Sequence, residues 1–188
     1  RVAGESERVV QGRTSLTAAL PPGHYGHALL SAYDARLASA QGDHPRALPL
    51  WRQALPAVQK ATDGLGSTEF VVLAGMARTE LALGLQADAL QHANLAVALA
   101  RDRLHKLGIT QSYWLGLVLM NQGVVALGAG QRALGEAALR ESLEQMAATT
   151  GPANLITAEA RQALDALAQK AGSVAALAAP RMSITPRT

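Results

Sequence analysis

Hydrophobic residues recur at three- and four-residue steps along most of this chain, and this spacing predicts amphipathic helices. Between Gly42 and Lys60, for example, Leu48, Trp51, Leu55 and Val58 fall on one face of a helix. Where the period stops, clusters of glycine, threonine and proline predict turns. The pattern predicts helices at about 24–41, 44–62, 68–83, 86–107, 111–129 and 132–149, and a seventh at about 153–170.

Three prolines lie inside the second of these segments. Proline removes a backbone donor and clashes with the preceding turn, which costs roughly 3 kcal/mol in a helix interior. If Asp43 or His44 caps the helix, Pro45 lies in the first turn. Backbone N–H groups of that turn have no acceptor within the helix, so a proline there removes no helical hydrogen bond. Pro49 loses one hydrogen bond, which packing of neighbouring apolar residues has to offset. Pro56 predicts a kink near residues 52–56 or an early end to regular hydrogen bonding.

Small residues recur at a fixed spacing in three copies. Within each copy the steps are 7, 5 and 7 residues, and the copies are offset by 42 and 46 residues. A glycine occupies the second of the four small-residue positions, called marks below, in every copy. The three sets are Ala35, Gly42, Ala47 and Ala54; Ala77, Gly84, Ala89 and Ala96; and Gly123, Gly130, Gly135 and Ser142.

This repeat predicts antiparallel helix pairs. Each glycine falls where one helical pattern stops and the next begins, the position of a turn that tolerates positive φ. The small residues on either side then lie on facing helix surfaces and let the backbones approach. A single pair cannot bury its apolar face, whereas stacked pairs can, so the repeat predicts an α-solenoid.

The remaining segments are assigned by the same pattern. Thr110, like Asp43, is a predicted N-cap and Gly108 a predicted C-cap. The seventh helix has no partner after it, so we expect it to be a terminal cap. Residues 1–20 are interpreted as a remnant of a preceding repeat and 172–188 as a flexible tail.

The marks resemble the tetratricopeptide repeat, in the 42-residue subtype found in kinesin light chains and in many bacterial regulatory proteins. The segment ALPLWRQAL, Ala47–Leu55, is similar to the second helix of that subtype, and LPPGH, Leu20–His24, to the turn before the first helix. The chain departs from the pattern at Ala38 and Ala126, where tyrosine is usual. The resemblance implies a right-handed solenoid over residues 21–171, with repeats at about 24–66, 67–109 and 110–151 and a cap at 153–171.

Composition supports an all-α fold. Hydrophobic residues make up 49% of the 188 residues but aromatics only 3%, so the apolar content is mainly alanine, leucine and valine. The net charge is +3, and two arginines of the tail account for most of it. No basic cluster is interleaved with aromatics, which argues against nucleic acid as a partner. No apolar run is long enough to predict membrane insertion. Because the chain begins with Arg1, we expect it to be a piece of a longer or processed protein.

The sequence offers no arrangement typical of an enzyme. There is no cysteine, and no metalloprotease, phosphate-loop or nucleophile-elbow motif occurs. His24 and His27 share a helix face but lack a third ligand, so a turn histidine and an exposed histidine are the simpler interpretation. We therefore expect no catalytic residues, no metal and no cofactor.

Repeat equivalence points to a binding surface instead. Arg36 and Arg78 are 42 residues apart and each follows a small residue mark. The family resemblance implies that this position lines a concave groove, together with Tyr33 and Asn121, which lie close by in their repeats. Two stacked guanidinium groups suit a carboxylate or an acidic peptide. The alternative is that the arginines only keep the concave face hydrated.

The stretch from Trp114 to Met120 is almost continuously apolar. Such a helix is either sandwiched between other helices or covered by a partner. Trp114, Leu117 and Met120 are therefore candidate interface residues, and the partner could be a second copy of this chain. The sequence thus predicts a protein–protein interaction scaffold that binds a protein or peptide in a concave groove. The alternative is a small-molecule-sensing or regulatory domain of a larger bacterial signalling protein, a kinase or transcriptional regulator. A cytoplasmic location is favoured over others.

Overall fold

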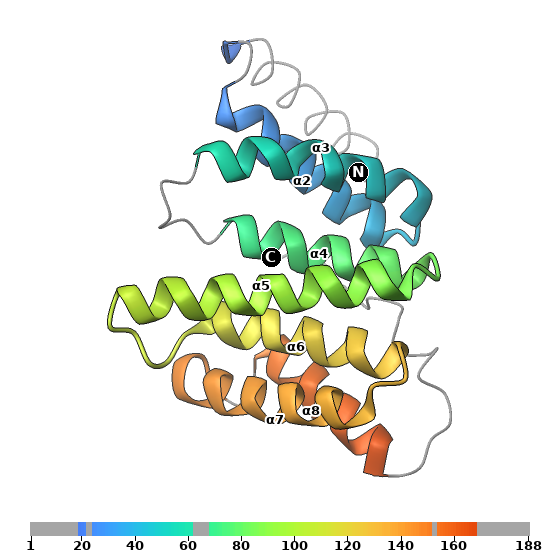
Figure 1. Cartoon of the computed structure of the whole chain (residues 1–188), viewed down its shortest axis with the longest axis vertical. Coiled ribbons are helices and arrows are strands. Elements are labelled where there is room, and N and C mark those ends of the chain that lie inside the picture. Colours follow the sequence, from blue (N-terminus) through green and yellow to red (C-terminus); the bar gives the residue numbers. More distant parts are fainter. Residues whose placement is uncertain (1–18, 22–23, 62–67, 152–153, 169–188) are drawn as a thin grey trace, which may run out of the picture.

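The computed structural model describes residues 19–21, 24–61, 68–151 and 154–168, which form helices and connecting turns with no strand (Figure 1). The all-α prediction is therefore confirmed for this part of the chain, and each helix begins and ends within two residues of its expected bounds. Of the expected repeat remnant over 1–20, residues 1–18 lie outside the described residues, as does the tail over 172–188. The helices are α2 (Tyr25–Ala40), α3 (His44–Ala61), α4 (Thr68–Ala82), α5 (Gln86–Lys106), α6 (Tyr113–Gly128), α7 (Arg132–Thr149) and α8 (Leu155–Ala168).

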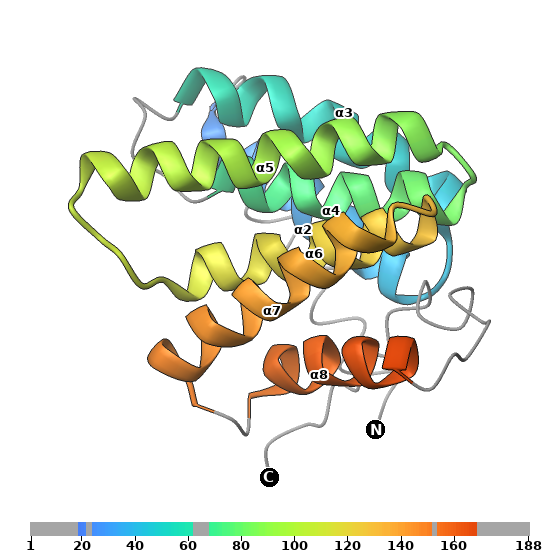
Figure 2. The same ribbon diagram turned by 60° about the horizontal axis from the view of Figure 1, so that its bottom comes forward.

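Helices that follow one another in sequence pack against one another. Contacts run from α2 to α3 and onward to α8, and α4 also contacts both α2 and α6. Figure 1 shows the same order from the blue to the red end of the molecule. In Figure 2, α3 and α5 lie on one side, α4 and α6 lie in the middle, and α8 lies on the opposite side. The last helix is thus placed on the side away from α3 and α5.

Three glycine turns join the first helix of each predicted pair to the second. Gly42, Gly84 and Gly130 have φ values of 79°, 79° and 78°, the left-handed region that favours glycine. The prediction of positive φ at these marks is confirmed. In each turn the residue after the glycine donates a backbone hydrogen bond to a carbonyl five residues earlier, closing the helix end. The pairs are Asp43 with Ala38, Leu85 with Glu80, and Gln131 with Ala126.

The nine small residues that flank the turns are all buried. In the third copy Gly123 of α6 faces Gly135 of α7: a Cβ added to Gly123 would lie 3.2 Å from the Gly135 carbonyl oxygen and 2.6 Å from Leu139 Cγ. Only residues without a large side chain allow this approach.

Trp51 of α3, the proline-containing helix, packs against α4 and also contacts α2. This side chain anchors α3 to the two helices. Its side chain is 4% exposed and lies over Gly75 of α4. The indole Nε1 donates to Thr79 Oγ1 at 3.0 Å, and Ser39 Oγ lies 3.0 Å from the same hydroxyl. Trp51 is therefore a core residue with a satisfied polar edge.

Helix α3 runs through Pro49 and Pro56 to Ala61, so the expected early end of regular hydrogen bonding near Pro56 is wrong. Both prolines are on the exposed side of the helix. The carbonyl that loses its donor at Pro56 belongs to Arg52, which is also exposed. Solvent can hydrate that carbonyl, and this lowers the cost of the proline.

Helix termini agree with two of the three predicted caps. The Asp43 carboxylate accepts from the Arg46 backbone N–H at 3.3 Å, and Gly108 has φ 66° just after α5. Thr110 is not an N-cap. The cap of α6 is Ser112, whose Oγ accepts from the Trp114 N–H at 3.1 Å, because Gln145 of α7 accepts from the Ser112 N–H at 2.8 Å and holds the loop there.

Candidate functional site

Helix α8 covers an apolar surface of α6 and α7. Its Ala160 and Ala163 are fully buried, and small side chains at these two positions allow the helix to lie close to its neighbours. The resulting cluster also contains Met120, Val124, Leu127 and Leu139, with Leu117, Leu143, Ile156, Leu164 and Leu167 packed against it.

Two of the three candidate interface residues belong to this cluster. Met120 is buried, and Leu117 packs against the same side chains. Trp114 lies outside the cluster and is 42% exposed, with its ring edge-on to that of Tyr113 at 5.2 Å between centroids. The apolar character of α6 is thus accounted for by the helices packed around it, α4, α5, α7 and α8, while Trp114 remains accessible.

An ion pair joins α8 to α4. Arg78 Nη1 donates to Glu159 Oε1 at 3.0 Å and also lies 3.6 Å from Met120 Sδ. The Arg78 side chain is 13% exposed and that of Glu159 37%. The guanidinium that the sequence assigned to a groove is therefore already bound to a carboxylate of the same chain.

Arg36 differs from its repeat equivalent. It is exposed on α2 and makes no ion pair with any of the residues that the structure describes. Tyr33 and Leu37, one helical turn apart on α2, are 66% and 48% exposed. These side chains place a cation next to apolar surface. The surface around the repeat-equivalent positions Arg36 of α2, Arg78 of α4 and Val124 of α6 is called the α2–α4–α6 face below.

Asn121 is bonded within its own helix. Its Nδ2 donates to the Leu117 carbonyl at 2.8 Å, four residues earlier. The side chain is half-buried. Of the four predicted groove residues, Tyr33 and Arg36 are therefore open to solvent, whereas Arg78 and Asn121 have partners in the chain.

Three of the histidines make contacts within the chain. His24 Nδ1 accepts from the Gly26 N–H at 3.0 Å and caps α2, and His27 Nε2 lies 3.1 Å from the Pro21 carbonyl. His92 Nδ1 pairs with the buried Glu80 at 2.8 Å. Among the described residues no group of three histidines and carboxylates is placed to hold a metal ion.

A buried ion pair fixes α5 on α4, away from α8. Arg103 donates to the Glu69 carboxylate, and both side chains are about nine-tenths buried. The guanidinium also lies 5.7 Å from the centroid of the Phe70 ring. Because both charges are enclosed by the helices they join, removal of one would leave the other buried and uncompensated.

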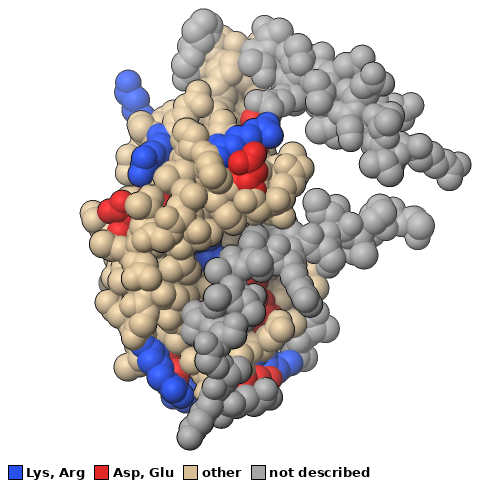
Figure 3. Space-filling view, turned by 90° about the vertical axis from the view of Figure 1, so that its right-hand side faces the viewer, with Lys and Arg blue, Asp and Glu red and all other residues tan. Residues whose placement is uncertain are grey.

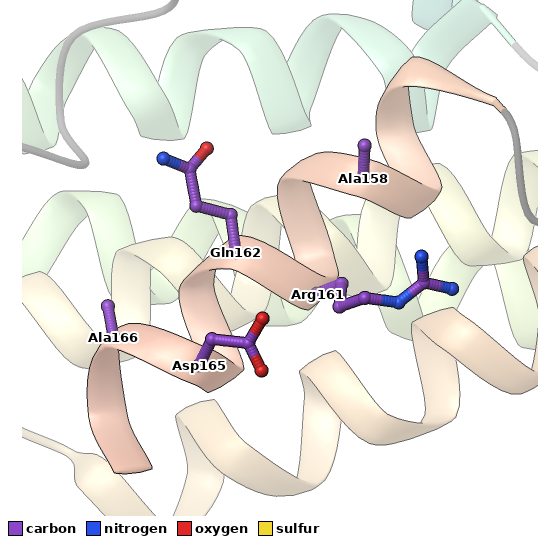
Figure 4. A pocket seen from close by; sticks show the side chains of 5 residues that line it. All are labelled: Ala158, Arg161, Gln162, Asp165 and Ala166. Carbon is purple, nitrogen blue, oxygen red and sulfur yellow. The ribbon is translucent and has the colours of Figure 1, made fainter. Parts of the chain in front are cut away.

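A shallow cavity of about 430 Å³ runs along the outer surface of α8. Figure 4 shows its described lining, which comes from α8 alone: Ala158, Arg161, Gln162, Asp165 and Ala166.

This cavity does not concentrate charge of one sign, since it carries one arginine and one aspartate. The part of the surface that Figure 3 describes likewise shows small groups of charged residues of both signs separated by uncharged surface. Nucleic acid requires a continuous basic surface, and this view offers none over its described residues.

Sequence reasoning missed Glu159. A carboxylate on an exposed-looking helix position gives no signal of its long-range partner, 81 residues away. The sequence does contain one indication that this position is covered: the third copy has Val124 where the first two have Arg36 and Arg78. An apolar residue there indicates that this end of the face is covered, and Val124 indeed packs in the α8 cluster.

Comparison with models of known protein families and with curated proteins finds no match for this chain. None of the described helices combines the length and the apolar character needed to span a membrane.

Proposed function

We propose that this chain is a protein-interaction scaffold in which the α2–α4–α6 face binds a segment of another protein. In this proposal the pairs α2–α3, α4–α5 and α6–α7 run antiparallel and stack as a right-handed, tetratricopeptide-like solenoid. The turn glycines and buried small residues support the pairing, since they recur at equivalent places in all three copies. The first helices then share one side of the array.

The observation that carries the proposal is the seating of α8 on this face. A helix bearing a carboxylate packs on α7 and α6 and pairs with Arg78 of α4 at the edge of this face. The face therefore has the shape and charge to hold a polypeptide segment. Arg36 occupies the equivalent position one repeat earlier, and it is exposed beside Tyr33 and Leu37. The α2 end of the face is left for an acidic segment from outside.

The small-molecule-sensing alternative draws no support from the cavity along α8. Ligand pockets are concave and enclose most of their ligand. The described lining of this cavity is one helix surface that is largely exposed. We therefore retain the scaffold function.

The proposal is tested by selecting peptides from a random display library on the purified chain. Selected peptides should be rich in Asp and Glu, and they should bind more weakly at high salt, because exposed charges are screened over about 8 Å at physiological ionic strength. Replacing both Tyr33 and Arg36 by alanine should weaken the binding of these peptides by roughly 1–3 kcal/mol.

Arg46 and Arg52 provide the matched control. Both are exposed arginines on α3, away from the proposed face, so their double alanine variant loses charge without losing the site. Fluorescence anisotropy of labelled peptides gives the affinities. Equal affinity for wild type and the Tyr33/Arg36 variant, or equal loss in both double variants, would place binding elsewhere.

A further inference from the structure

Helix α8 occupies the part of the α2–α4–α6 face that would otherwise offer Arg78 to a partner. The guanidinium cannot pair with an external carboxylate in the same geometry while Glu159 holds it. Met120 and Val124 are likewise covered by the α8 cluster. What remains open lies on α2, around Tyr33 and Arg36.

The contacts of α8 define the chemistry that this surface accepts. Two alanines, Ala160 and Ala163, form the close contact, and larger apolar residues pack on either side. Glu159 stands next to this stripe and supplies the charge that meets Arg78. An amphipathic helix with small residues on its apolar stripe and an adjacent carboxylate fits the surface; an extended peptide does not reproduce these contacts.

Helix α8 has fewer large buried side chains than α7, the helix it packs against. In α7, Leu139 and Met146 are fully buried. In α8 the fully buried apolar side chains are alanines, while Ile156, Leu164 and Leu167 are only half-buried. The Glu159 carboxylate is partly exposed, so solvent screens its pairing with Arg78. Elements with few large buried side chains open most readily.

We infer that α8 occupies the binding site of the partner within the same chain, and that the partner is an acidic amphipathic helix which replaces α8 on α4, α6 and α7. This inference rests on the proposed function and adds the partner's form and its regulation to it. A partner first meets the open α2 end and gains Arg78, Met120 and Val124 only when α8 leaves. Its apparent affinity is reduced by the small fraction of molecules in which α8 is undocked.

The test uses a fluorescein-labelled peptide with the sequence of Leu155–Ala168 as the probe. The receptors are the full chain and a full-length Ala163→Asp variant, whose new charge cannot remain in the fully buried site. If α8 is undocked in about a tenth or less of wild-type molecules, the variant should bind the probe at least about tenfold more tightly. Circular dichroism checks that the variant stays folded. Should it unfold, full-length Glu159→Arg replaces it, because this change only sets like charges against each other at Arg78.

Charge exchange then locates the probe. A probe carrying Glu159→Lys should bind more weakly, because it sets its lysine against Arg78. A receptor carrying Arg78→Glu should bind this probe with restored affinity, because opposite charges then face each other. The matched control is a probe carrying Asp165→Lys, the same change on the exposed side of α8, which should bind like the original. A folded receptor with undocked α8 that binds the probe no better than wild type would overturn the inference.

The two proposals fail in different ways. If library-selected peptides bind wild type and the undocked variant equally, while still requiring Tyr33 and Arg36, the scaffold function stands and the role of α8 is refuted. If the probe binds the undocked variant but selected peptides neither compete with it nor depend on Arg36, then α8 is displaceable and the proposed binding face is wrong.

Discussion

Replacing Gly75 by alanine tests how closely α3 and α4 pack. A Cβ at Gly75 would lie 2.6 Å from Trp51 Cζ2 and 2.7 Å from Cη2, well inside the 3.5–4.0 Å separation of carbon atoms in contact. The indole cannot turn away, because it is 4% exposed and its Nε1 is bonded to Thr79. The helices therefore have to separate or the ring has to leave its rotamer.

The magnitude follows from two opposing terms. Overpacking of this kind costs about 1–3 kcal/mol, and alanine regains about 0.5–1 kcal/mol over glycine within a helix. From the middle of each range we expect a net destabilisation of about 1 kcal/mol, and each kcal/mol lowers Tm by about 2–4 °C for a chain of this length.

The assay is thermal and urea unfolding followed by circular dichroism. Gly128→Ala is the control, since its Cβ would meet Leu81 Cδ2 at 2.7 Å, the end of a flexible, half-buried side chain that can move aside. Combining Gly75→Ala with Trp51→Leu should remove the penalty of the alanine, because the clashing ring is gone. An unchanged or raised Tm for Gly75→Ala alone would refute the close contact between Trp51 and α4.

Three further predictions concern the packing of the helices. Ala89→Leu places a large side chain at a fully buried contact of α5 and should destabilise the chain by roughly 1–3 kcal/mol in urea unfolding; unchanged stability would count against the helix contacts described. Arg103→Ala leaves the Glu69 carboxylate buried without that partner and should cost about 3–5 kcal/mol, whereas Arg101→Ala, at an exposed pair, should cost about 0–1 kcal/mol; similar losses would contradict the difference in burial. A chain ending at Gly151 exposes the surface that α8 covers and should form oligomers in light scattering; a truncated chain that stays monomeric and equally stable would show that this apolar cover is dispensable.

The repeat was predictable from sequence because it rests on local rules. A glycine between two helical patterns requires no knowledge of distant residues, and Gly42, Gly84 and Gly130 have the expected φ. The cap of α6 could not be read in the same way, since Ser112 rather than Thr110 is selected by Gln145 of another helix. Proline effects also depend on context: Pro56 is tolerated because its side of α3 is exposed.

The candidate site was predictable only in part. Repeat equivalence singled out Arg36 and Arg78 together, yet the structure separates them, one exposed and one paired with Glu159. The pairing depends on how α8 folds back over α6, and neither charge carries a signal of that path in the sequence. A long-range ion pair is a property of the packed helices rather than of local pattern.

The α2–α4–α6 face as a binding surface is tested most directly by hydrogen–deuterium exchange of the full chain with and without a library-selected acidic peptide. We predict slower exchange of backbone amides in α2 and α4, where the peptide would lie, together with faster exchange in α8 as it is displaced. Protection confined to α3, α5 or α7, with α2, α4 and α8 unchanged, would contradict the account.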